Sequence, residues 1–140
     1  MAVPKRHRVD VWLPPGDLER ARAMAMARGF SRKVPEHDRR QGDLAGYVRA
    51  WMRRQNQDKD RLSKLYAQLR SKGESLAASD PESPAVRWEF RVTAGDLKKL
   101  EEAASFAGFR QGGRGNVSAF MRAIVRMACR IGPPRQVHEP

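Results

Sequence analysis

The chain has 140 residues, and its 28 Lys and Arg against 16 Asp and Glu give a formal net charge of +12. This length fits one compact domain, or two small halves that share a core. So basic a chain indicates an anionic partner, with nucleic acid ahead of a membrane surface. The single cysteine, Cys129, excludes an intrachain disulfide and fits a cytoplasmic protein. No apolar run approaches the roughly 20 residues that span a bilayer, so we expect no membrane insertion.

The chain carries an internal repeat of a short strand and two helices. Gly95 and Phe109 lie 79 positions after Gly16 and Phe30, and the offset then falls to 73 because the first copy has a longer loop. Each half is smaller than a chain that usually folds alone, so we expect the halves to bury their apolar faces against each other. The residues identical in both copies include, in first-copy numbering, Arg8, Gly16, Asp17, Leu18, Ala25, Gly29, Phe30, Arg49, Ala50 and Arg53.

The first copy follows a basic arm over residues 1–7 and is expected to span residues 8–53. Residues 8–13 alternate as a half-buried strand does, with Val9, Val11 and Leu13 on the inner side. Pro15 suits the first turn of a helix that runs to about residue 28, where Gly29 ends it. Residues 31–42 are expected to form a long basic loop. A second helix then begins at Asp43, whose side chain can cap it.

Residues 54–86 are expected to join the copies. Leucines and Tyr66 at helical spacing predict a helix up to Gly73, and residues 74–85 read as a flexible linker. The second copy covers residues 87–131, with an alternating strand, a helix capped by Thr93, a turn at 112–115 and a last helix capped by Asn116. Residues 132–140 are expected to be a loose tail.

Three motifs that suggest reactive sites have simpler explanations. The Gly-Gly-Arg-Gly stretch at 112–115 follows a helix and lacks the Gly-Lys-Ser/Thr ending of a phosphate-binding loop. The Glu-His-Asp triplet at 36–38 has no second His or Cys at metal-ligand spacing. Cys129 ends an apolar helix and is expected to be a core residue. The sequence therefore predicts no catalytic residue, no metal, no cofactor and no enzymatic activity.

The order strand, helix, turn and helix, together with the string Asn-Val-Ser-Ala-Phe-Met-Arg at 116–122, resembles the ribbon-helix-helix family of DNA-binding proteins. In that family two copies pair their strands into an antiparallel ribbon, which enters the major groove of DNA. The resemblance implies a mainly α fold with a short two-stranded ribbon, and a tandem pseudo-dimer in one chain. Single-chain tandem forms resemble accessory proteins of bacterial conjugation, the TraY-like relaxosome proteins and the MobC-like mobilisation proteins.

The outward face of the expected ribbon supplies candidate base contacts. Arginine can read guanine through O6 and N7, a carboxylate can accept from the cytosine amino group, and tryptophan can pack on a thymine methyl. An alternative is that these charges only form cross-strand ion pairs, with the acids orienting the arginines. Because the two strands differ, the site should be asymmetric. The candidates are Arg87, Glu89, Arg91, Arg8, Asp10 and Trp12.

Candidate phosphate contacts cluster at the starts of the second helices, where free N–H groups and the helix dipole attract anions. Asp43 departs from this pattern because its carboxylate repels a phosphate, and plain capping is the alternative for both Asp43 and Asn116. The basic arm can also follow the DNA backbone. The candidates are Arg114, Asn116, Val117, Ser118, Arg39, Arg40, Lys5 and Arg6.

The expected function is sequence-specific binding of double-stranded DNA, as an accessory protein at a conjugative transfer origin that assists a relaxase or coupling protein. The alternative is a ribbon-helix-helix repressor or a plasmid operon autoregulator. A single chain is the expected binding unit, and higher oligomers on DNA stay open. A nuclease or relaxase would need a metal cluster or a nucleophilic tyrosine, whereas Tyr47 and Tyr66 lie on apolar helical stripes.

Overall fold

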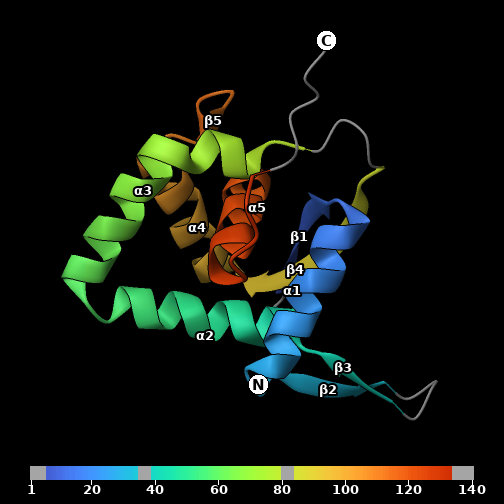
Figure 1. The fold of residues 1–140 in the computed structure, drawn as a ribbon. Coiled ribbons are helices and arrows are strands. Elements are labelled where there is room, and N and C mark those ends of the chain that lie inside the picture. The colour runs from blue at the N-terminus through green and yellow to red at the C-terminus, as the bar shows by residue number, and fades with distance from the viewer. Residues whose placement is uncertain (1–5, 35–38, 80–83, 134–140) are drawn as a thin grey trace.

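A computed structural model of the chain describes residues 6–34, 39–79 and 84–133. Within these ranges the protein is mainly helical, with three short two-stranded antiparallel sheets. In Figure 1, α5 runs through the middle, α2 and α3 bracket it on one side, and the β2–β3 hairpin projects from the opposite corner. The elements are β1 (Arg6–Leu13), α1 (Pro15–Ala27), β2 (Ser31–Val34), β3 (Arg39–Gly42), α2 (Leu44–Asn56), α3 (Lys59–Ala77), β4 (Val86–Thr93), α4 (Ala94–Phe106), β5 (Arg110–Gln111), β6 (Arg114–Gly115) and α5 (Val117–Ala128).

The two long strands, β1 and β4, pair with each other although three helices and the β2–β3 pair lie between them in the chain. Their register places Val9 opposite Phe90, Asp10 opposite Glu89 and Val11 opposite Trp88. The alternation predicted from the sequence is confirmed, because one face of the ribbon is buried in the core. That face consists of Val9, Val11, Leu13, Trp88, Phe90 and Val92.

The helix boundaries follow the predicted local signals. α1 begins at Pro15, and the Thr93 hydroxyl accepts a hydrogen bond from the Asp96 N–H at the start of α4. Gly29 and Gly108, just beyond α1 and α4, have φ angles of +89° and +97°, which only glycine adopts without strain. Asp43 and Asn116 cap α2 and α5 by accepting from the N–H groups of Gly46 and Ala119.

The prediction of a loop over residues 31–42 is wrong for the described part of that segment. Residues 31–34 and 39–42 form the β2–β3 hairpin, with Ser31 opposite Gly42. The hairpin was not evident from the sequence because all its residues except Val34 and Gly42 are polar and no alternation appears. Its closing residue packs tightly, since a Cβ on Gly42 would lie 2.0 Å from the carbonyl oxygen of Arg22 in α1. The predicted turn at 112–115 is likewise part of a hairpin, β5–β6.

Three further boundaries differ from those predicted. Strand pairing begins at Arg6, inside the expected arm, and α2 runs three residues past 53 to Asn56. α3 does not stop at Gly73 but continues to Ala77, so the expected linker at 74–85 begins as helix. Position 73 suits glycine although it lies within the helix, because a Cβ there would lie only 2.7 Å from the Phe109 ring. Buried Leu69 and Leu76 continue the apolar stripe across it.

Equivalent contacts are found within each half, between residues related by the offsets seen in the sequence. Gly115 lies against the Glu101 carbonyl, at 2.0 Å from an added Cβ, as Gly42 lies against that of Arg22. The Phe30 and Tyr47 rings meet edge to face at 5.6 Å between centroids, and Phe109 and Phe120 do so at 6.0 Å. Each half therefore contains one contact of either kind.

One buried ion pair breaks this correspondence. Arg126 on α5 is completely buried and donates to Asp17 Oδ2 through Nε and Nη2, at 3.1 and 2.9 Å. Its Nη1 donates to the carbonyls of Leu76 and Ala78 at the end of α3. The corresponding residues of the other half, Arg53 and Asp96, are exposed and form no ion pair with each other.

Replacing Asp17 with Asn tests the weight of this ion pair. The change leaves the Arg126 guanidinium buried without its counter-charge, so the free energy of unfolding should fall by about 3 kcal/mol. The matched control is Asp96→Asn, which removes an acidic residue from the same turn of α4 and should cost less than about 1 kcal/mol. Urea unfolding followed by circular dichroism measures both, and equal losses would contradict the role given to the buried pair.

Candidate nucleic-acid interface

The six candidate base-contacting residues lie together on the outer face of the β1–β4 ribbon. The register groups them into three cross-strand pairs: Arg8 with Arg91, Asp10 with Glu89, and Trp12 with Arg87. The three arginines and Trp12 are exposed, and Trp12 keeps 46% of its surface accessible although it is a large hydrophobic residue. The two acids are half-buried at the centre of the face.

Ion pairs link the charges on this face. Glu89 contacts three arginines: Arg87 at 3.1 Å, Arg8 at 3.5 Å and Arg91 at 3.8 Å between nitrogen and oxygen. Arg8 also lies 3.1 Å from Asp10. Asp10 and Glu89 are like charges placed directly opposite each other, an arrangement that the surrounding arginines compensate. Ion pairing of the acids with the arginines, the alternative drawn from the sequence, is therefore present on this face.

Two arginines outside the ribbon hold its backbone, a feature that the sequence analysis missed. Arg49 on α2 donates to the carbonyl of Arg91, and its guanidinium lies 4.9 Å from the centre of the Phe90 ring. Arg122 on α5 donates to the carbonyl of Trp12 at 2.6 Å. Both arginines occupy the same position in the two copies, and so do the residues whose carbonyls they bind. The identity of Arg49 and Arg122 between the copies was the available signal.

The candidate phosphate contacts are only partly placed as predicted. Asn116 and Val117 lie at the start of α5 and are half-buried, while Arg114 is exposed on β6. The Ser118 hydroxyl does not face outward, since it donates to the Asp10 carbonyl at 2.8 Å. This bond fixes the start of α5 beside the middle of the ribbon.

The remaining basic candidates lie on or beyond the first hairpin and the arm. Arg40 is exposed and donates through Nε to the Ser31 hydroxyl at 2.8 Å. Lys5 lies outside the described residues, as do the side chains of Arg6 and Arg39, whose backbones belong to β1 and β3. Their predicted contacts stay predictions.

No group of three or more His, Cys, Asp or Glu side chains is placed to hold a metal ion among residues 6–34, 39–79 and 84–133. None of the helices in these ranges is long and apolar enough to cross a membrane. Cys129 is buried, as predicted, and burial raises the pKa of its thiol to about 12.

Comparison of the chain with models of protein families, with curated proteins and with solved structures found no match.

The Cys129 thiol should be unreactive while the protein is folded. Because the thiolate is the nucleophile, a pKa near 12 leaves only about one thiol in ten thousand ionised at pH 8. Labelling with a disulfide reagent at pH 8 should proceed at least about a thousandfold more slowly in native buffer than in guanidinium chloride, where the thiol has its ordinary pKa. Native and unfolded rates within tenfold of each other would contradict the buried position of the thiol.

Proposed function

We propose that the protein binds duplex DNA sequence-specifically, by inserting the outer face of the β1–β4 ribbon into the major groove. We propose further that its halves act as two ribbon-helix-helix units paired within one chain. The observation that carries both statements is the strand register. Asp10 and Glu89 occupy the same position in the two copies, 79 residues apart, and they pair directly with each other. An antiparallel ribbon centred on equivalent residues is what a pseudo-twofold axis requires.

The contacts of the second helices support the same two-unit arrangement. Arg49 and Arg122 bind the carbonyls of Arg91 and Trp12, and these partners are again equivalent residues. Each second helix is thus attached to the strand of the opposite unit. The contacts of Gly42 and Gly115, and the edge-to-face ring pairs, also occur once in each unit.

The chemistry of the ribbon face matches the edges of bases. The major groove is about 12 Å wide and admits a two-stranded ribbon. Arg8, Arg87 and Arg91 present guanidinium groups that suit guanine O6 and N7, and Trp12 offers an apolar surface to a thymine methyl. Asp10 and Glu89 can accept from amino groups near the centre of the site.

The ion pairs on this face do not prevent base contact. Exposed pairs contribute only about 0–1 kcal/mol each, because water screens both partners. The arginines can therefore exchange a carboxylate for a base at a small cost in free energy. Before binding, the acids keep the arginine side chains in place on the ribbon face. Phosphates on either side would meet the α5 N-terminus with Asn116 and Val117, and the basic residues Arg114 and Arg40. The net charge of +12 favours such contacts.

The ends of the ribbon differ, which favours a directional site. One end presents the Arg8–Arg91 pair and the other the Trp12–Arg87 pair. A protein set in one direction suits a transfer origin, which is processed on one strand. We therefore propose a cytoplasmic accessory role in conjugation, with a relaxase or coupling protein as partner. The alternative is a repressor that autoregulates a plasmid operon, a function that a palindromic operator within its own promoter would favour.

These roles differ in what the bound protein changes. An accessory protein should raise the rate at which a relaxase nicks supercoiled DNA that carries the bound site. A repressor should lower transcription from a promoter overlapping that site and leave nicking unchanged.

Arg91→Ala tests the proposed readout. A site is first selected from random duplex DNA, and binding is then measured to that site and to a scrambled duplex. The variant should bind the selected site about 5- to 150-fold more weakly, from a loss of about 1–3 kcal/mol, while the scrambled duplex changes by only a few-fold. The matched control is Lys64→Ala on α3, which removes an exposed positive charge away from the ribbon.

The control should change binding to either duplex by less than about twofold, since a single distant charge is screened by salt. Full retention of sequence preference by Arg91→Ala would contradict readout through the ribbon. Absence of duplex binding by the unaltered protein at low salt would contradict the proposed function as a whole.

A further inference from the structure

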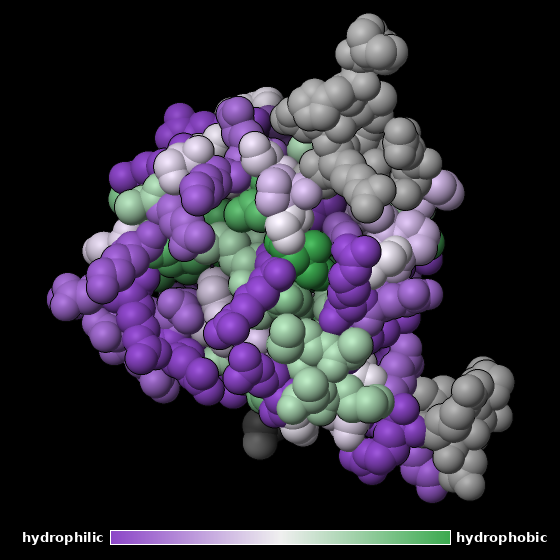
Figure 2. All heavy atoms as spheres, viewed as in Figure 1, coloured by the Kyte–Doolittle hydropathy of each residue, from purple (hydrophilic) through white to green (hydrophobic). Residues whose placement is uncertain are grey.

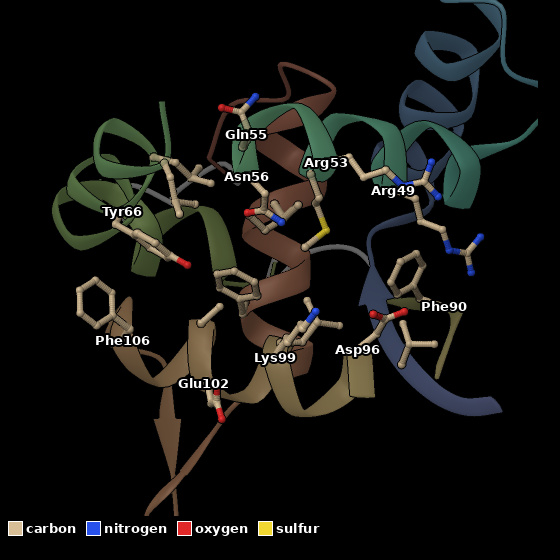
Figure 3. Close-up of a pocket in the computed structure, with 18 residues that line it drawn as sticks. Arg49, Arg53, Gln55, Asn56, Tyr66, Phe90, Asp96, Lys99, Glu102 and Phe106 are labelled. Atoms are coloured by element: carbon tan, nitrogen blue, oxygen red, sulfur yellow. The ribbon is translucent and has the colours of Figure 1, made fainter. Parts of the chain in front are cut away.

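A cavity of about 640 Å³ opens between α2, α3 and α4. Its floor is apolar and formed by core residues, among them Phe90, Leu100, Phe120 and Ile124. Figure 2 shows hydrophobic residues in the hollow that α2 and α3 border. In Figure 3, Arg49 and Asp96 gather with Phe90 at one end of this cavity, while Tyr66 and Phe106 face each other at the far end. Its size lies within the usual range of binding pockets.

The other half of the molecule contains the counterpart of this cavity, and there it is filled. The residues equivalent to Arg49, Arg53 and Asp96 are Arg122, Arg126 and Asp17. Arg122 donates to the Ala77 carbonyl, and Arg126 donates to those of Leu76 and Ala78. The C-terminal end of α3 therefore covers that side, with Leu76 and Ala77 buried in the core.

No described segment covers the open side. Arg53 lines the cavity and is exposed, and its guanidinium makes no hydrogen bond or ion pair with residues 6–34, 39–79 or 84–133. Its position corresponds to that of Arg126, whose guanidinium binds helix-end carbonyls. A helix C-terminus carries unpaired carbonyls and a partial negative charge, so it complements a guanidinium. Lys99 adds a second cation to the same rim.

The aromatic end of the cavity supplies an exposed apolar contact surface. The Tyr66 and Phe106 rings meet edge to face at 5.0 Å between centroids, and Arg70 lies 4.5 Å from the Phe106 ring centre. Phe106 remains 60% exposed, which is unusual for so large a hydrophobic side chain. Tyrosine and arginine are enriched in the residues that dominate protein–protein binding.

We propose that the cavity between α2, α3 and α4 binds the C-terminal end of an amphipathic helix from a protein partner. A leucine-like side chain of that helix enters the apolar floor, and the last carbonyls of the helix accept from Arg53. The proposal rests on the two-unit arrangement given above, and it supplies a docking surface on the helical side of the ribbon. The same chain can then hold DNA and a protein partner at once.

The test uses a fluorescein-labelled, C-terminally amidated peptide of residues 68–78, the α3 end that fills the counterpart site. Anisotropy is measured on the full-length protein without DNA. Saturable binding with a Kd between about 10 μM and 1 mM is expected, because few side chains take part. The same peptide with Asp in place of its leucine at position 76 should bind at least tenfold more weakly.

Arg53→Met supplies the decisive variant, with Arg54→Met on the same helix as the matched control. Arg53→Met should weaken binding of the peptide about tenfold, because a hydrogen bond from a charged donor is lost. Arg54→Met should change it by less than twofold, since Arg54 is exposed and does not line the cavity. Ala103→Phe, which places a ring in the cavity, should also weaken binding.

Several outcomes would overturn the proposal. They are no binding at 1 mM peptide, equal binding by all three variants, and a concentration-dependent dimer of the chain that Arg53→Met dissociates, which would identify a second copy as the occupant. DNA binding by Arg53→Met should stay within twofold of the unaltered protein. If neither the unaltered chain nor any variant binds DNA, the proposed function is contradicted. The peptide result would still test the cavity independently.

Discussion

β1 and β4 pair over their full length although α1, the first hairpin, α2 and α3 lie between them in the chain. An isolated two-stranded ribbon is at best marginally stable, so this pairing depends on the core behind it. The core in turn depends on the ribbon, because Val11, Leu13 and Phe90 lie on its inner face. The same pairing lines up the arginines on the outer face. Fold and proposed DNA recognition therefore share one constraint, the register centred on Asp10 and Glu89.

Around this centre the molecule is uneven. On one side Arg126 is neutralised by Asp17 and covered by the end of α3, and on the other Arg53 faces an open cavity. A single α3 can cover only one of two equivalent positions. The joining helix α3 thus makes the helical side asymmetric. The different residues of β1 and β4 make the ribbon asymmetric as well. Both features suit a complex in which DNA and a protein partner bind in fixed orientation.

The sequence predicted β1 and β4, the caps of α2, α4 and α5, and the composition of the ribbon face, because each rests on local signals such as alternation, Thr93 and Asn116. It missed the β2–β3 hairpin, whose polar residues show no pattern, and it ended α3 at Gly73. Gly73 packs against the Phe109 ring, and that contact forms only when the chain is folded. The inward bond of Ser118 and the cavity beside Arg53 were hidden for the same reason. Each arises from residues far apart in the sequence, and no local pattern reports them.

Methylation interference on a selected duplex tests the central claim most directly. Dimethyl sulfate modifies guanine N7 in the major groove and adenine N3 in the minor groove, so one experiment separates the two grooves. Readout by the ribbon predicts that N7 methylation of a few guanines blocks binding of one chain per site, with different patterns in the two half-sites. Interference only at adenine N3, or binding that no methylation affects, would contradict insertion of the β1–β4 ribbon into the major groove.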